Sequence, residues 1–292
     1  MTASDPQARA PTGPVAVVTG ASSGIGREMA LALARGGTAV VILGRDASRG
    51  REVLAEIEEE SGDREASLVC ADFARQAEVR RASAEILARH PRIDILLNNA
   101  GLYERRLSES PDGIETTFAV NHLAPYLLTR LLLPALTAAA SPGRSARIVN
   151  VASEAHRGAR FDPADPEGRK EGKGYGRYGR SKLANILFTY ELARRLDGSR
   201  VTVNALHPGV IATRIVRDTP AFVRVLWSLF ARSPAKGAAT PVWLATSPAV
   251  EGLTGRYFVD CREARSSPES LDREAQARLW AVSARMTGLS DD

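Results

Sequence analysis

The stretch Val15-Ala-Val-Val-Thr-Gly-Ala-Ser-Ser-Gly-Ile-Gly26 decides the fold, because a short apolar run leads directly into a glycine-rich turn. The β-branched residues of Val15 to Thr19 predict a buried strand, and the amphipathic pattern from Gly24 to Arg35 predicts a helix after it. At the start of such a helix, unpaired backbone N–H groups and the helix dipole favour a pyrophosphate. An ordinary strand-to-helix turn is the alternative. The predicted phosphate-binding turn comprises Gly20, Ser22, Ser23, Gly24, Ile25 and Gly26.

Strand-like runs alternate with helical patterns along the rest of the chain. The predicted strands are Val15 to Thr19, Ala39 to Leu43, Ser67 to Cys70, Ile93 to Leu97, Arg147 to Val151, Val201 to Ala205 and Arg256 to Val259. The predicted helices are Gly24 to Arg35, Ser48 to Glu60, Gln76 to Arg89, Gly113 to Leu136, Tyr178 to Leu196 and Pro234 to Thr246. Such alternation requires right-handed crossovers. We predict the α/β class, with a single doubly wound (Rossmann) domain whose seven-stranded parallel sheet carries helices on both faces.

Composition argues against several kinds of site and partner. The 292 residues include only two cysteines, Cys70 and Cys261, and their separation predicts neither a disulfide framework nor a metal-ligand cluster. The four histidines also lack ligand spacing, so no metal is expected. The net charge of +5 comes from arginines scattered among many acidic residues, which argues against nucleic acid as a partner.

Two parts of the sequence, the N-terminal residues and the most apolar stretch, indicate where in the cell the protein is expected. Residues 1–13 are polar and lack the apolar region of a signal peptide, so we predict a flexible tail before one domain over residues 14–292, in the cytoplasm. The stretch Leu123 to Ala140 is interrupted by Pro125, Arg130 and Pro134, which argues against a transmembrane segment. We expect a buried helix there instead.

Polar motifs follow the predicted strands at one topological position. The glycine-rich turn follows the first strand, Asn98 to Gly101 follows the fourth, Ser153 lies past the fifth, and His207-Pro208-Gly209 follows the sixth. Ligands of a doubly wound sheet bind at the carboxyl ends of its strands. These motifs are therefore expected to form one site.

The end of the second strand bears on the choice of cofactor. An acidic residue there would bind the ribose hydroxyls of NAD, whereas Gly44-Arg45 offers a cation for the 2′-phosphate of NADP. Arg27 is a candidate second cation, and an exposed loop charge is the alternative for Arg45. Asp46 is expected to cap the next helix. Asp72 is expected either to accept a hydrogen bond from the adenine amino group or to cap the helix after Phe73.

Tyr178-Gly-Arg-Ser-Lys182 places a phenol and an ammonium one helical turn apart on the same face. A cation so held lowers the pKa of a phenol, which is otherwise near ~10, and makes it a usable proton donor or acceptor. On an isolated helix the same spacing usually means a solvated face. Here Thr19 to Gly26, Asn98 to Gly101, Asn121 and Ser153 precede it in order.

With these motifs the chain resembles a classical short-chain dehydrogenase/reductase from about Val15 to Leu289. It is most similar to the retinol dehydrogenase-like branch of that family. The motifs that carry the branch resemblance are Cys70-Ala-Asp-Phe73, Val120-Asn-His-Leu123, Ser153-Glu-Ala-His156, Ser181-Lys-Leu-Ala-Asn185 and Tyr257-Phe-Val-Asp-Cys261.

The resemblance implies a catalytic tetrad of Asn121, Ser153, Tyr178 and Lys182. Tyr178 would exchange a proton with the substrate oxygen and Ser153 would donate a second hydrogen bond to it. Lys182 would lower the phenol pKa and bind the nicotinamide ribose, and Asn121 would hold a water. Taken alone, Ser153 could instead be a turn residue and Asn121 a helix-interior group bonded to backbone. The resemblance also implies which residues contact the cofactor. They are the residues of the predicted phosphate-binding turn, Arg45, Tyr178 and Lys182, together with Asp72, Phe73, Asn99, Ala100, Gly101, Pro208, Gly209, Ile211 and Thr213.

The expected activity is NADP(H)-dependent interconversion of a carbonyl and an alcohol on a lipophilic small molecule. A non-catalytic NADP-binding regulator of the same fold is the alternative. The insert Gly168 to Gly179 is longer than in most of the family and is expected to form an active-site rim, where Tyr175 is a poorer proton donor than Tyr178.

The apolar segment near residues 213–235 resembles the substrate lid of the family. An apolar lid suits a lipophilic substrate better than a sugar. Packing onto the fold, a homo-oligomer face and weak peripheral membrane contact are the alternatives for this segment.

Overall fold

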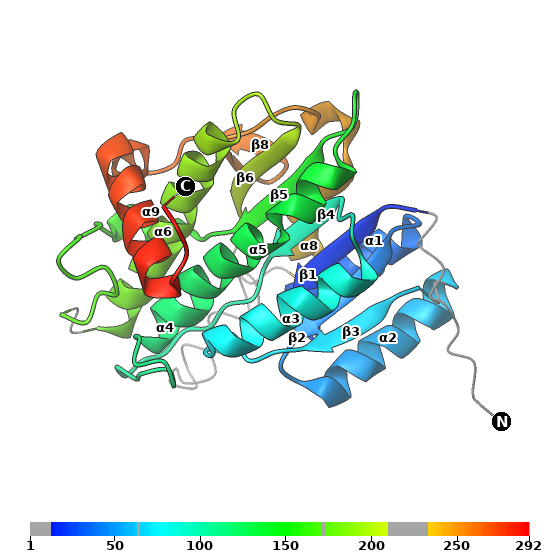
Figure 1. The fold of residues 1–292 in the computed structure, drawn as a ribbon, viewed down its shortest axis with the longest axis horizontal. Coiled ribbons are helices and arrows are strands. Elements are labelled where there is room, and N and C mark those ends of the chain that lie inside the picture. The colour runs from blue at the N-terminus through cyan, green and yellow to red at the C-terminus, as the bar shows by residue number, and fades with distance from the viewer. Residues whose placement is uncertain (1–12, 63–64, 171–172, 210–232, 292) are drawn as a thin grey trace.

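A computed structural model describes residues 13–62, 65–170, 173–209 and 233–291. The predicted tail, residues 1–13, therefore lies outside the described part except for its last residue. The described residues form one eight-stranded sheet with the strand order β3-β2-β1-β4-β5-β6-β7-β8 (Figure 1). The predicted doubly wound sheet is confirmed. Its strands are β1 (Val15–Thr19), β2 (Ala39–Gly44), β3 (Ser67–Cys70), β4 (Ile95–Asn98), β5 (Ala146–Val151), β6 (Val201–His207), β7 (Arg256–Val259) and β8 (Arg262–Ala264).

The eighth strand corrects the predicted count of seven. Strands β1 to β7 are parallel, whereas β8 runs antiparallel to β7, with Val259 paired to Arg262. The two-residue connection, Asp260 and Cys261, has positive φ at both positions (49° and 56°), as a tight hairpin requires. The sequence pattern missed β8 because it has three residues and two of them are exposed and charged.

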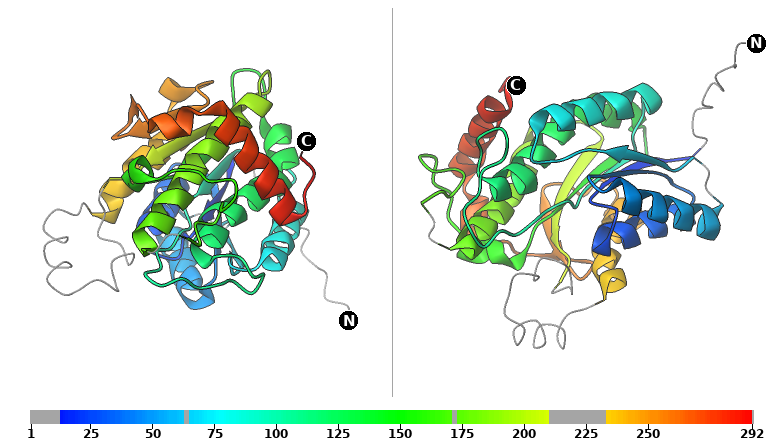
Figure 2. Two further views of the ribbon diagram at one scale, coloured as in Figure 1. Left: turned by 90° about the vertical axis from the view of Figure 1, so that its left-hand side faces the viewer. Right: turned by 90° about the horizontal axis from the view of Figure 1, so that it is seen from below.

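Helices cover both faces of the sheet. They are α1 (Gly24–Arg35), α2 (Ala47–Ser61), α3 (Gln76–Arg89), α4 (Thr116–Phe118), α5 (Ala124–Ala139), α6 (Gly174–Arg195), α8 (Pro234–Thr246) and α9 (Arg273–Thr287). Short turns of helix are η1 (Ala119–Leu123), η2 (Glu154–Gly158), η4 (Pro248–Val250) and η5 (Pro268–Leu271). In the view from below, α3 and α5 lie on one side of the sheet and α1, α2 and α8 on the other (Figure 2).

Alternation along β1 shows how two separate cores form. Val15 and Val17 pack with residues of α3, α5 and α6, whereas Ala16 and Val18 pack with residues of α1 and α8. Successive side chains of a strand point to opposite faces, so a strand buried on both faces must be apolar throughout. This explains why the run from Val15 contains no charged residue.

The predicted helix Gly113 to Leu136 is wrong at its beginning. Helical structure starts at Thr116, where the Glu115 side chain accepts a hydrogen bond from the Phe118 amide (2.7 Å), and passes through the π-helical turn η1 before α5. Such π turns occur often at functional sites, and η1 contains Asn121. Helix α6 begins at Gly174, so Tyr178 lies one turn inside it rather than at its start.

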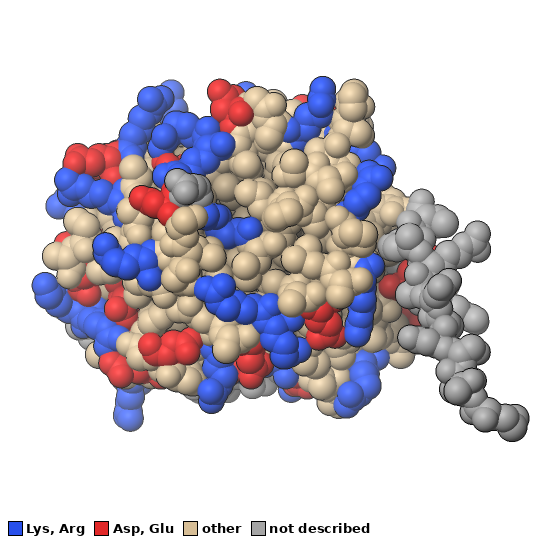
Figure 3. All heavy atoms as spheres, viewed as in Figure 1, with Lys and Arg blue, Asp and Glu red and all other residues tan. Residues whose placement is uncertain are grey.

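Among the described residues, no helix combines the length and apolar character needed to cross a bilayer. On the face drawn in Figure 3, Lys and Arg side chains are interspersed with Asp and Glu. The cytoplasmic location and the oligomeric state stay predictions.

Candidate active site

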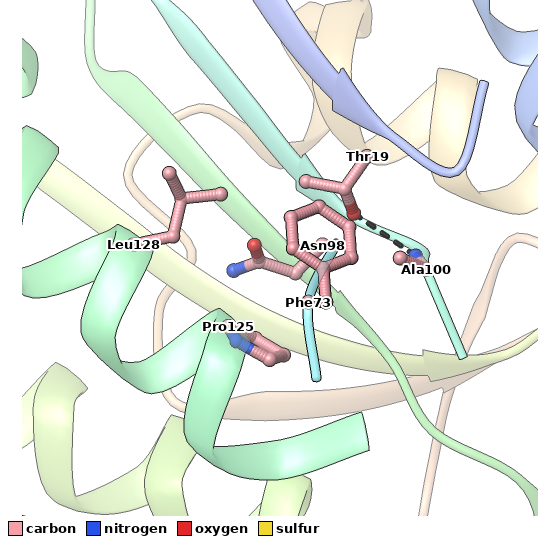
Figure 4. Close-up of a pocket in the computed structure, with 6 residues that line it drawn as sticks. All are labelled: Thr19, Phe73, Asn98, Ala100, Pro125 and Leu128. Atoms are coloured by element: carbon pink, nitrogen blue, oxygen red, sulfur yellow. Dashed lines mark hydrogen bonds between the residues drawn. The ribbon is translucent and has the colours of Figure 1, made fainter. Parts of the chain in front are cut away.

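Thr19, the last residue of β1, ties the glycine-rich turn to the end of β4. Its hydroxyl oxygen accepts hydrogen bonds from the amides of Asn99 (2.8 Å) and Ala100 (2.9 Å) and donates to the carbonyl of Leu97 (3.2 Å). Asn99 also donates its side-chain amide to the Thr19 carbonyl (2.9 Å). Figure 4 shows Thr19 and Ala100 joined across the carboxyl edge of the sheet. Two of the predicted motifs are therefore one structural unit.

The glycine-rich turn has the shape that a pyrophosphate needs. Gly20 and Gly24 adopt positive φ (67° and 58°), which side-chain-bearing residues rarely tolerate. A Cβ atom at Gly26 would lie 2.3 Å from the Gly20 carbonyl oxygen, so only glycine lets α1 approach the turn. Ser23 is the N-cap of α1, yet its side chain makes no capping hydrogen bond. The N-terminal amides of α1 remain suited to an anion.

The remaining residues of the turn differ in their surroundings. Ile25 is buried in the core between α1 and the sheet, so its backbone rather than its side chain faces the turn's opening. The Ser22 hydroxyl lies beside the end of β2, where a Cβ atom at Gly44 would be 3.6 Å from it. Ser22 and Ser23 are both partly exposed.

Arg45, directly after β2, is exposed and makes no ion pair within the described part of the chain. Arg27, the candidate second cation, is instead paired with Glu56 (2.7 Å) and Glu28 (2.5 Å), and the hydrogen bond to Glu56 raises its pKa. Asp46 caps α2 by accepting from the Arg49 amide (3.1 Å), as predicted. Of the two cations, Arg45 is the one available to a 2′-phosphate.

Asp72 and Phe73 form the turn between β3 and α3. Asp72 accepts a hydrogen bond from the Ala74 amide (3.0 Å), whereas the N-cap position of α3 is Arg75. Asp72 therefore stabilises the turn before the helix. The Phe73 ring closes a small pocket at the end of β1 and β4 (Figure 4). The other lining residues are Thr19, Asn98, Ala100, Pro125 and Leu128.

Asn121 joins the loop after β4 to α6. Its side-chain oxygen accepts from the Leu102 amide (2.7 Å), and its side-chain nitrogen donates to the Leu102 carbonyl (2.9 Å) and to the Ser181 hydroxyl (3.0 Å). The Asn121 side chain is thus bonded to backbone, and its role in holding a water stays a prediction. Gly101 lies between Asn121 and Lys182, because a Cβ atom there would be 3.2 Å from Asn121 Oδ1 and 3.4 Å from Lys182 Nζ.

The side chains of Ser153 and Tyr178 lie near each other. Ser153 follows β5 in extended backbone, and its oxygen accepts from the Ala155 amide (3.3 Å). That bond leaves the hydroxyl proton free to be donated. The Tyr178 side chain is partly exposed, but burial around its hydroxyl raises the phenol pKa, and the nearby Ser153 side chain opposes that shift. The ring of Tyr103 packs edge-on against Tyr178, with centroids 6.0 Å apart.

Lys182 corrects one expectation. Its Nζ lies 5.7 Å from the Tyr178 ring centroid and donates to the Val151 carbonyl (3.0 Å), and burial lowers the pKa of Lys182 to about 8. The sequence predicted that Lys182 would lower the Tyr178 pKa, yet the phenol pKa is raised. The physical reason is that burial of both groups disfavours charge on either one.

Pro208 and Gly209 follow β6, as predicted, and Gly209 has φ of 89°. Ile211 and Thr213 lie outside the described residues, and so does the lid segment up to residue 232. The end of the predicted lid belongs to α8, because Ser233 caps that helix and Pro234 begins it. Tyr175, at the start of α6, is 63% exposed.

Sequence reasoning missed three contacts of this site. Nothing in the sequence indicated that Tyr103 contacts the site, except its position two residues after Gly101. Glu115 and Arg177 form a buried ion pair (3.3 Å) between the segment before Asn121 and the residue before Tyr178. His156 belongs to the branch motif Ser153-Glu-Ala-His156, but no sequence pattern indicated its hydrogen bonds.

A parallel sheet with a glycine-rich turn and a Ser-Tyr-Lys group at its carboxyl edge defines the class of nicotinamide-dependent oxidoreductases. The short chain dehydrogenase family matches residues 14–223, and the chain belongs to that family.

The relatives include proteins of the predicted branch. The chain is 40% identical over 299 residues to retinol dehydrogenase 14 of Homo sapiens, an alignment that covers 95% of this chain and 87% of that protein. It is 42% identical over 283 residues to polyprenol dehydrogenase of Mus musculus, with 94% and 84% covered. The retinol dehydrogenase-like branch is therefore confirmed.

Solved structures share the fold. A protein from Mycobacterium paratuberculosis superposes with a TM-score of 0.77 at 28% identity, covering 96% of this chain and 95% of that one. The NADP active-site complex of RhlG from Pseudomonas aeruginosa gives a TM-score of 0.70 at 28% identity, covering 84% and 94%.

Proposed function

We propose that this protein is an NADP(H)-dependent oxidoreductase that interconverts a carbonyl and an alcohol on a lipophilic small molecule, with Tyr178 as proton donor and acceptor. The observation that carries the proposal is the arrangement of Ser153, Tyr178 and Lys182. The Ser153 side chain is close enough to the phenol of Tyr178 to lower its pKa, and the Lys182 ammonium lies 5.7 Å from the same ring.

The raised pKa of Tyr178 keeps its phenol protonated at neutral pH, which suits a proton donor to a carbonyl oxygen. Ser153 donates a second hydrogen bond to that oxygen, since its own oxygen already accepts from the Ala155 amide. Lys182 places a positive charge near the oxygen on which negative charge develops. The nicotinamide, when bound, supplies or accepts the hydride. Alcohol oxidation uses the same groups in reverse, with Tyr178 accepting the proton.

Several features fit NADP as the cofactor. The α1 N-terminus with Gly20, Gly24 and Gly26 would hold the pyrophosphate, and Arg45 would pair with the 2′-phosphate. Lys182, which lies beside Gly101, would bind the nicotinamide ribose. The NADP complex of the Pseudomonas aeruginosa relative supports this choice. The part of the cofactor site between the 2′-phosphate and the nicotinamide would be lined by Asn99, Ala100, Pro208 and Gly209.

A lipophilic substrate is supported by the names of the relatives, which refer to retinol and polyprenol. It is also supported by the surface next to Tyr178. Tyr175 and Leu107 are two of the three large hydrophobic side chains that are exposed among the described residues, at 63% and 50%. Their segments touch, because Gly174 packs against the backbone of Glu104 and Arg105. Exposed apolar side chains on two segments that touch near the proton donor favour an apolar substrate.

The test compares Tyr178→Phe with Tyr175→Phe, its matched control three residues away on the same helix. A panel of lipophilic aldehydes and ketones is followed by NADPH consumption. Tyr178→Phe should bind NADPH as the wild type does and lose turnover by roughly 10²- to 10⁴-fold, because only the proton donor is removed. Tyr175→Phe should keep its activity. Turnover within a few-fold of wild type in Tyr178→Phe would refute the proposal. NADPH binding without turnover of any panel member by the wild type would favour the regulatory alternative.

A further inference from the structure

The carbonyl oxygen of Ser153 is held by a buried histidine. His156 Nδ1 lies 2.6 Å from this oxygen, and the His156 side chain is fully buried. A carbonyl oxygen can only accept a hydrogen bond, so Nδ1 must carry the proton. The imidazole therefore donates a hydrogen bond to the carbonyl of the peptide group between Ser153 and Glu154.

The second ring nitrogen has the opposite role. The backbone amide of Ser267, at the start of η5, donates to His156 Nε2 over 3.0 Å. An amide can only donate, so Nε2 must be unprotonated. The two bonds together select one neutral tautomer of His156. Both ring nitrogens are used, one toward the candidate active site and one toward the C-terminal segment.

The surroundings keep the imidazole neutral and fixed. Burial lowers the pKa of His156, and Arg157 lowers it further, whereas the Ser153 carbonyl, Glu154 and Glu269 act in the opposite direction. The ring packs against that of Tyr257, with centroids 5.2 Å apart. Tyr257 in turn donates its hydroxyl to Glu154 (2.9 Å), the residue next to Ser153.

Ser153 is thus held from both sides of its backbone. The amide of Ala152 donates to the Leu206 carbonyl of β6 (2.8 Å), and the His156 imidazole donates to the Ser153 carbonyl. The same carbonyl also accepts from the backbone amide of His156 (3.1 Å), and the Ser153 hydroxyl oxygen accepts from the Ala155 amide (3.3 Å). The imidazole adds a further bond that limits rotation of the Ser153–Glu154 peptide, and such a rotation would displace the Ser153 hydroxyl.

We propose that His156 is a positioning residue that fixes the Ser153 peptide and, through it, the hydroxyl that contacts Tyr178. Ser267 holds the imidazole in the donating tautomer. This inference rests on the proposed function, because it gives His156 a role only if Ser153 acts on the substrate oxygen. His156 itself does not contact the reacting atoms.

Two substitutions separate the two hydrogen bonds. The side-chain amide of His156→Asn reaches the position of Nδ1 and can donate to the Ser153 carbonyl. The longer side chain of His156→Gln reaches the position of Nε2 and can accept from Ser267 instead. We expect His156→Asn to keep kcat within about threefold of wild type and His156→Gln to lose roughly tenfold or more, with the KM for NADPH unchanged in both.

The controls distinguish this inference from the proposed function. His90→Gln removes another buried histidine at the end of α3, on the opposite edge of the sheet, and should leave kcat unchanged. If Ser153→Ala and Tyr178→Phe retain turnover, the proposed function fails. If those two lose turnover while His156→Gln keeps it, the positioning role alone is overturned.

Equal losses in His156→Asn and His156→Gln, accompanied by equal drops in thermal stability, would also overturn the positioning role. They would show that His156 serves packing only. If His156→Gln does not fold, His156→Ala replaces it in the comparison with His156→Asn. Wild-type kcat in the Ala variant would contradict the inference.

Discussion

The ammonium of Lys182 donates a 3.0 Å hydrogen bond to the carbonyl oxygen of Val151, the last residue of β5. The side chain is buried, and burial lowers its pKa from 10.5 to about 8. In the unfolded chain the same amine holds its proton up to its ordinary pKa. Between pH 8 and 10.5 the unfolded state therefore binds more protons, and stability rises with pH in that window. At neutral pH the full cost of burying the charge is present.

We predict that Lys182→Met increases the free energy of unfolding at pH 7, by roughly 2 kcal/mol, while it abolishes turnover. The gain should shrink as the pH rises from 8 to 10.5, because the wild-type amine then loses its charge. Urea unfolding at pH 7 and pH 10 measures both quantities. Lys236→Met, at an exposed position of α8, is the control and should change neither. A destabilised Lys182→Met variant at pH 7 would show that the bond to Val151 outweighs the cost of burial.

Arg45 should decide between the two nicotinamide cofactors. We predict that Arg45→Ala raises the KM for NADPH about tenfold or more and hardly changes that for NADH, because a charge-assisted hydrogen bond to phosphate contributes ~1.5 to 3 kcal/mol. Initial rates with each cofactor measure the effect. Arg27→Ala serves as the comparison and should change cofactor preference less, since Glu28 and Glu56 already occupy Arg27. Equal use of NADPH and NADH by the wild type would contradict this role of Arg45.

The buried pair of Glu115 and Arg177 should matter for stability. Both side chains are almost fully buried (0% and 3% exposed), so removing the carboxylate takes away the negative charge that Glu115 places beside a buried guanidinium. Glu115→Ala should destabilise the fold by about 3 to 5 kcal/mol, and it also removes the cap of α4. The exposed pair Glu274 and Arg278 provides the contrast, because Glu274→Ala should have almost no effect. Chemical denaturation of both variants tests the difference. A loss in Glu115→Ala as small as that in Glu274→Ala would mean that water reaches Arg177.

His122 should contribute to the loss of stability in acid. Burial lowers its pKa to about 3, although the neighbouring Asn185 side chain opposes the shift. Below about pH 6.5 the imidazole binds a proton in the unfolded state, whereas it stays neutral in the folded state until the pH approaches 3. The free energy of unfolding therefore falls as the pH decreases from about 6.5 toward 3. Replacing the imidazole by the non-titrating amide of His122→Gln, which can still bond to the Ser283 hydroxyl, should flatten this dependence by up to ~1.4 kcal/mol per pH unit. Unfolding curves at pH 6.5, 5.5 and 4.5 measure the slope. An unchanged slope would place the acid sensitivity at His90 or His156, whose pKa values are also lowered by burial.

The doubly wound sheet and the edge at which the site lies could be predicted from the sequence. Buried parallel strands must be apolar on both faces, so Val15 to Thr19 and its counterparts are visible as short continuous runs. Gly20 and Gly24 are required by their positive φ and Gly26 by its approach to the Gly20 carbonyl, and Asp46 caps its helix within three residues. Such features depend on neighbours along the chain. For that reason they could be predicted without tertiary information.

The partners of the polar side chains became known only from the three-dimensional arrangement. Asn98 belongs to a motif of the site, yet its amide donates to Thr129 and Asn150 in the core, 31 and 52 residues away. The pKa of Tyr178 is raised rather than lowered because burial, which no local pattern reveals, acts on both Tyr178 and Lys182. His156 obtains its tautomer from Ser267, 111 residues further along the chain. Hydrogen bonds and desolvation depend on which atoms meet in space, and the fold brings these atoms together across separations that sequence periodicity does not encode.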